Sequence, residues 1–167
     1  RTRYCNSEER EIEPMKITFA KGALDSAPLG ILRIRFTEDA KGTKRLVREG
    51  KVDTLELGTG KAGEVTNRQY ITLIRAMVQT ARAQKAKRIA VSFESTPKLW
   101  KNLSFSSPEQ ASQLFAENAE MANFQFTTFK TKPKDGWNEI EEIFLYDTAT
   151  PAMKAGIKRG QAIGRAV

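Results

Sequence analysis

The stretch from Val52 to Glu94 constrains the fold of this 167-residue chain more than any other stretch. Apolar residues alternate from Val52 to Leu57 and again from Arg88 to Glu94, which is the period of a half-buried strand. Between these strands, a set of apolar residues recurs at helical spacing: Tyr70, Leu73, Ile74, Met77, Val78 and Ala81. A β-α-β unit of this kind needs a sheet to join and a second layer to cover that sheet.

The flanking segments supply the rest of an α/β domain. Alternating apolar residues predict further strands at 15–19, 32–36, 44–49 and 138–146, with Gly50 and Lys51 closing a tight turn. Helix-start signals occur three times: Thr66 with Gln69, Ser107 with Pro108 and Gln110, and Thr150 with Pro151. The chain is long enough for one domain with a sizeable core, and we expect a single folded unit.

The last predicted helix carries glycines at intervals of four residues. Gly156, Gly160 and Gly164 would make a smooth helix face that another element can approach closely. The apolar pattern is still running at Val167, which predicts a chain cut inside a helix. At the other end, residues 1–14 are polar and aperiodic, and we expect a tag remnant or a disordered extension there.

Composition excludes several kinds of chemistry. The chain has no histidine and one cysteine, so a Ser-His-Asp arrangement, an imidazole-based zinc site and an internal disulfide are all impossible. No apolar run is long enough to span a membrane, and the N-terminal stretch does not resemble a signal peptide, so we expect a cytoplasmic protein. The formal charge of +8 favours anionic partners, nucleic acid among them.

A glycine-rich turn joins the first strand of the β-α-β unit to its helix. Gly58, Gly60 and Gly63 satisfy the spacing G-x-G-x-x-G, which is typical of a dinucleotide-binding loop. In such a loop the helix begins within the glycines, whereas here the capping signal comes at Thr66. The alternative interpretation is that the glycines only turn the chain. The phosphate-loop motif fails, because Leu55 stands where its first glycine should be.

Two groups of basic residues are candidates for an anionic-partner surface. Arg68, Arg75 and Arg82 recur every seven residues and could form a ridge along the helix, here called the basic ridge. A solvated helix face is the alternative, and the spacing favours it. Lys130, Lys132 and Lys134 follow aromatic residues between Phe124 and Phe129 that could stack on single-stranded nucleic acid. Anchoring of a helix end in the core is the alternative for these aromatics.

Several of these motifs, taken in order, resemble the N-terminal domain of the leucyl (cytosol) aminopeptidases. They are the segment from Leu55 to Lys61 with its GTGK turn, the helix start Asn67-Arg68-Gln69-Tyr70, the stretch from Phe124 to Lys132, and the closing helix from Gly156 to Val167. The resemblance covers residues 15–167. The family usually has a helix between its second and third strands, and a short loop, 38–43, replaces it here.

The resemblance implies a three-layer α/β fold similar to macro domains, with a mixed central sheet and helices on both faces. It places the N-terminal domain at 15–148 and the start of a connecting helix at 149–167. The family's two divalent metal ions (zinc or manganese) and its catalytic residues belong to a C-terminal domain, so no catalytic, cofactor-binding or metal-binding residue is assigned in this chain. It further implies that the parent enzyme removes N-terminal residues from peptides.

The same resemblance implies particular partners. These are the chain's own C-terminal catalytic domain, other copies of the enzyme in a homo-hexamer that this domain helps to assemble, and DNA, which some bacterial members bind. A nucleic-acid-binding module and a macro-like nucleotide-binding domain are the alternatives to an aminopeptidase domain.

Overall fold

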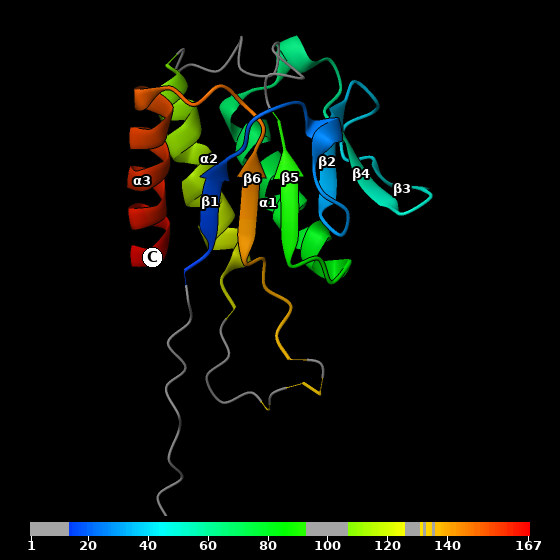
Figure 1. Ribbon diagram of the computed structural model, residues 1–167. Helices are drawn as coiled ribbons and strands as arrows, with labels where there is room; N and C mark the ends of the chain where they lie inside the picture. Colours follow the sequence, from blue (N-terminus) through cyan, green and yellow to red (C-terminus); the bar gives the residue numbers. More distant parts are fainter. Residues whose placement is uncertain (1–13, 93–106, 126–130, 132, 135) are drawn as a thin grey trace, which may run out of the picture.

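The computed structural model describes residues 14–92, 107–125, 131, 133, 134 and 136–167 (Figure 1). Within these residues, six strands form one mixed sheet in the order β1-β6-β5-β2-β4-β3. The strands are β1 (Lys16–Phe19), β2 (Leu32–Thr37), β3 (Lys44–Glu49), β4 (Val52–Gly58), β5 (Arg88–Val91) and β6 (Glu142–Leu145). Neighbouring strands run parallel, except for the antiparallel hairpin of β3 and β4. The predicted α/β class with a mixed sheet is confirmed.

The predicted β-α-β unit forms the centre of the fold. β4 leads through the short 3-10 helix η2 (Ala62–Glu64) into α1 (Asn67–Ala83), which returns the chain to β5. β2 pairs with both strands and therefore lies between them. The capping box is present, because Gln69 N donates to Thr66 Oγ1 and Thr66 N donates to Gln69 Oε1.

The main core lies between the sheet and the helices α1 and α2 (Pro108–Asn123). Five residues of the α1 stripe are fully buried there: Tyr70, Ile74, Met77, Val78 and Ala81. Burying each large apolar side chain contributes about 1.5–3 kcal/mol, so this stripe outweighs the cap by several-fold. On the opposite face of the sheet, the 3-10 helix η1 (Leu24–Ser26) covers a smaller cluster that includes Ala90 and Tyr146.

The helix α3 (Pro151–Ala166) packs along α2, beside the edge of the sheet at which β1 lies (Figure 1). The glycine face makes this contact. A Cβ atom at Gly156 or Gly160 would collide with a backbone oxygen of α2, and one at Gly164 would lie 2.7 Å from Glu117 O. The predicted close approach is confirmed, and α2 is the helix that makes it.

Two local predictions were wrong. The last strand is shorter than 138–146, because Ile140 exchanges hydrogen bonds of 2.8 Å with the side chain of Asn123 instead of with a neighbouring strand. Ser107 precedes α2 as expected, with Pro108 at the first position, but its side chain makes no capping hydrogen bond.

In the helices of the described ranges, no segment is both long and apolar enough to cross a membrane.

Candidate functional site

Three backbone amides of the glycine loop already donate to the end of β2 or to the connection between β2 and β3. Gly58 N donates to Thr43 O at 2.8 Å, Thr59 N to Thr37 O at 2.9 Å, and Gly60 N to Asp39 O at 2.8 Å. A phosphate-binding loop instead presents such N–H groups to its ligand. This geometry supports the interpretation that the glycines shape a turn, and it does not support the dinucleotide-binding one.

At Gly58 this connection lies directly against β4. A Cβ atom there would collide with Ala40 O and would lie 3.0 Å from the Thr43 side chain. Gly42 N also donates to Gly58 O at 3.2 Å, so the loop 38–43 is tied to the end of β4 from both sides. We call this arrangement the loop clamp.

The three arginines of the basic ridge make different contacts in the structure. Arg82 donates from Nε to Asn138 O at 2.7 Å and from Nη1 to Ala122 O at 2.8 Å. Burial lowers the pKa of its guanidinium below the usual arginine value, while the nearby charge of Glu139 opposes that change. Arg82 therefore connects α1 to the end of α2 and to the segment before β6.

Arg75 has a similar structural role two turns earlier in α1. Its Nε donates to Asn118 Oδ1 at 2.9 Å, and its Nη2 lies 3.9 Å from Met121 Sδ. In the described part of the chain, Arg68 is the one arginine of the three that is exposed and whose side chain makes no such contact. The three arginines thus differ in their contacts, and an anionic-partner surface that they share stays a prediction.

The predicted lysines are only partly within the described residues. Lys134 is exposed, while Lys130 and Lys132 lie outside the described residues, as do the aromatics from Phe126 to Phe129. Phe124, at the end of α2, is 68% exposed. A nucleic-acid surface built from these side chains stays a prediction.

Arg68 belongs instead to a hollow of about 400 Å³ between the β3–β4 hairpin and α1. Lys41 and Lys44 line the same hollow, and we call it the basic pocket. Sequence reasoning missed both lysines, because they lie more than twenty residues before Arg68 and the hairpin brings them near it. The hairpin turn at Gly50 was the only signal that could have pointed to them.

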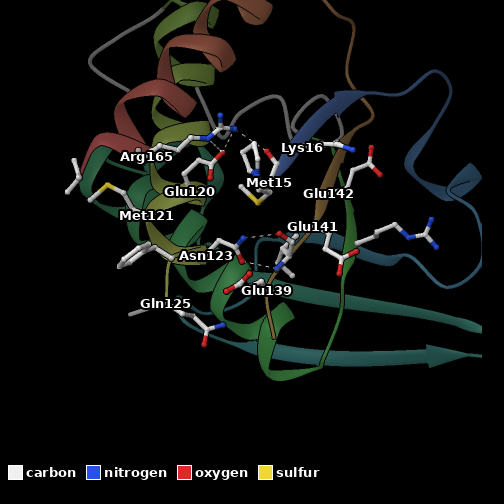
Figure 2. Close-up of a pocket in the computed structure, with 16 residues that line it drawn as sticks. Met15, Lys16, Glu120, Met121, Asn123, Gln125, Glu139, Glu141, Glu142 and Arg165 are labelled. Carbon is white, nitrogen blue, oxygen red and sulfur yellow. Dashed lines mark hydrogen bonds and ion pairs between the residues drawn. The ribbon is translucent and has the colours of Figure 1, made fainter. Parts of the chain in front are cut away.

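A second hollow, of about 620 Å³, lies where the C-terminal ends of α2 and α3 meet the starts of β1, β5 and β6 (Figure 2). Glu120 of α2 accepts from Arg165 Nη2 at 3.0 Å and from Gln161 Nε2 at 2.7 Å. Gln161 also donates to Met15 O at 2.7 Å. These four residues, here called the Glu120 network, join α2, α3 and the beginning of β1.

The carboxylates of this region have separate partners. Glu141 lies 3.6 Å from Lys87 Nζ, and Glu142 accepts from Thr18 Oγ1 at 3.1 Å. Figure 2 shows Glu139, Glu141 and Glu142 pointing in different directions. Among the described residues, no group of three or more His, Cys, Asp or Glu side chains is placed to hold a metal ion. The described carboxylates therefore do not fit a metal centre.

Comparisons with known proteins agree on one family. The family model described as "Cytosol aminopeptidase family, N-terminal domain" matches residues 43–133. A protein from Nostoc punctiforme (strain ATCC 29133 / PCC 73102), named "Probable cytosol aminopeptidase", is 32% identical over 100 residues. That match covers 60% of this chain and 17% of the relative, so the chain spans about a sixth of the curated protein that it matches.

Solved structures with the same fold include a tomato leucine aminopeptidase mutant, with a TM-score of 0.69, 15% identity, and coverage of 90% of this chain and 36% of that chain. The bottromycin maturation enzyme BotP matches with a TM-score of 0.60 and 16% identity, over 83% of this chain and 31% of that one. BotP in complex with Mn matches with a TM-score of 0.56. At these identities the likeness concerns the fold alone.

Proposed function

The chain belongs to the cytosol aminopeptidase family as an N-terminal domain, and from this premise we propose that it is the non-catalytic part of a leucyl aminopeptidase. The parent enzyme would remove N-terminal residues from peptides with two divalent metal ions, zinc or manganese, held in a C-terminal catalytic domain. The observation that carries this proposal is the match of the family's N-terminal domain to residues 43–133.

The chemistry of the described residues also supports the proposal that the catalytic groups lie outside this chain. The chain has no histidine, and the described carboxylates form no cluster of metal ligands. The Mn complex of BotP, which shares the fold, is consistent with manganese in the parent enzyme. We propose that the metal ligands and the peptide-binding groups lie outside this chain, and that the parent enzyme works in the cytosol.

The packing of α3 suggests what the domain does for its parent. Glycines bring α3 against α2, and the Glu120 network fastens its last turn to α2 and to Met15. A catalytic domain attached after α3 would therefore be held at a fixed orientation to this domain. We propose that this orientation supports assembly of the full-length enzyme into a homo-hexamer.

Hydrolysis of leucine-p-nitroanilide tests the proposal. The 167-residue chain and the parent protein are compared with added Mn²⁺ or Zn²⁺, against a blank that contains metal without protein. We expect turnover by the parent protein and no rate above the blank for the chain alone. Turnover by the chain alone at a rate near that of the parent protein would contradict a non-catalytic role.

Light scattering of the parent protein tests the proposed hexamer. A monomeric parent protein would contradict the assembly role.

A further inference from the structure

The basic pocket is lined by positively charged side chains. Its lining includes the cations Lys41, Lys44 and Arg68 and, among the residues that the structure describes, no carboxylate. Two other cations of the same hairpin meet acids: Arg45 pairs with Glu56 on the opposite face, and Arg48 pairs with Asp53 near the turn. The three pocket cations take part in no ion pair within the described ranges. Their combined field favours an anion.

The floor of the pocket is apolar. Leu57 and Val65 are each 2% exposed, and Leu73 is half-buried beside them. A hollow of about 400 Å³ is of the size that small organic ligands occupy, and an apolar floor with a few polar groups is typical of such sites. The ligand that fits both features has an anionic head and an apolar body.

The helix start is not the feature that would bind this anion. Thr66 and Gln69 already hydrogen-bond to each other in the capping box at the N-terminus of α1. The glycine-loop amides of Gly58 and Thr59 donate to the loop 38–43 or to the end of β2. The anionic head would therefore meet side-chain ammonium and guanidinium groups, which bind phosphate and carboxylate strongly.

Gly60 helps to position one of these cations. The residue has a φ of +70°, and a Cβ atom there would lie 3.0 Å from Lys41 Cγ and 3.1 Å from Lys41 Cε. The absence of a side chain lets the aliphatic stem of Lys41 lie across the loop. Lys41 thus lines the pocket from the loop 38–43, while Lys44 and Arg68 come from β3 and α1.

We propose that the basic pocket binds a small organic anion with a phosphate or carboxylate head and an apolar body. This site goes beyond the proposed function, since an N-terminal domain without catalytic groups would carry a ligand site of its own. Lys41, Lys44 and Arg68 hold the head, and Leu57, Val65 and Leu73 receive the apolar body.

Titration of the 167-residue chain, followed by amide chemical shifts, tests this site. The probes are phenyl phosphate and 4-phenylbutyrate, which carry both parts, inorganic phosphate, which is the head alone, and phenol, which is the body alone. We expect saturable shifts at Thr43, Lys44 and residues 68–73 with a two-part probe, and at least tenfold weaker binding of phosphate and phenol. The two-part probe that binds more tightly identifies the head group.

Substitutions separate a built site from general charge attraction. The double variant Lys44→Met with Arg68→Met should weaken binding of the better probe at least tenfold, while the matched double variant Lys154→Met with Lys158→Met, on the exposed face of α3, should leave it unchanged. Equal weakening by both pairs, or no saturable shift at the pocket with either two-part probe, would overturn the proposal. If the first pair disturbs the fold, Lys44→Gln alone gives the same comparison. None of these measurements uses peptidase activity, so their outcome is independent of the proposed function.

Discussion

Arg165, in the last turn of α3, donates from Nη2 to Glu120 Oε1 of α2 at 3.0 Å, and the same carboxylate oxygen accepts from Gln161. The side chain of Glu120 is 9% exposed, whereas that of Arg165 is 44% exposed. A carboxylate so well buried needs its partners, because an unpaired buried charge is costly. The hydrogen bonds of the Glu120 network thus hold α2 and α3 together in addition to the close contact at the glycine face.

Replacing Glu120 by Gln should lower the free energy of unfolding by about 1–2 kcal/mol, since the charge-assisted bonds from Arg165 become neutral ones. The cost stays moderate because Arg165 can turn toward water. Urea denaturation measures the change, and Asp53→Asn is the matched control, because its pair with Arg48 is exposed at the surface. Equal losses in the two variants would mean that burial of Glu120 has no energetic consequence.

Gly160→Leu should separate α3 from α2. Even a Cβ atom at this position would collide with Gln113 O and lie 2.9 Å from Ala116 Cβ, so a larger side chain must push the helices apart. We expect a loss of about 3 kcal/mol or more, which exceeds the gain of up to about 1 kcal/mol from the better helix propensity of leucine.

Ala155→Leu introduces the same side chain on the exposed face of α3 and is the control for this test. Its unfolding free energy should stay within about 0.5 kcal/mol of the unsubstituted chain. Thermal denaturation followed by circular dichroism compares the two variants. A Gly160→Leu chain as stable as the Ala155→Leu chain would show that close helix contact contributes nothing.

Local periodicity predicted most of the elements, because they depend on neighbouring residues in the chain. The capping box at Thr66, the buried stripe of α1 and the glycine face of α3 could all be read this way. The strand order could not be predicted in this way. β2 lies between β4 and β5, and these pairings leave no signal in the neighbouring residues of the chain.

The same limit explains what was missed at the candidate sites. Arg75 and Arg82 looked free in the chain, but their partners Asn118 and Asn138 lie more than forty residues away. The loop clamp and the basic pocket also depend on long-range contacts between the β2–β3 connection and the end of β4 or the start of α1. Charge spacing therefore placed these arginines on one helix but could not show what they contact.

Arg82→Met should lower the free energy of unfolding by about 1–3 kcal/mol, because two hydrogen bonds from a charged group to backbone carbonyls are lost. Arg82→Lys should recover only part of the loss, since one ammonium cannot replace the forked guanidinium. Arg68→Met, on the same helix but exposed, should change it by less than about 0.5 kcal/mol.

The pH dependence supplies a second readout for Arg82. Burial lowers its pKa in the folded chain, so the fold disfavours the charged form, and stability would rise only as the pH climbs through that lowered pKa toward the pKa of the unfolded chain. Arginine stays protonated well above neutral pH, so the difference between the Arg82→Met variant and the unsubstituted chain should be constant from pH 6 to about 9. A difference that varied across this range would assign the effect to another group.

Gly58→Ala should open the loop clamp. The added methyl group would collide with Ala40 O, and the hydrogen bonds of Gly58 and Gly60 to the loop 38–43 would lengthen as the loop moves away. We expect a loss of about 1–3 kcal/mol and faster amide hydrogen exchange at Gly58 and Gly60. Gly63→Ala places the same methyl group five residues later, where nothing lies within 4 Å, and should be neutral or slightly stabilising. If both variants kept the exchange rates of the unsubstituted chain, the loop would be held by contacts other than the clamp.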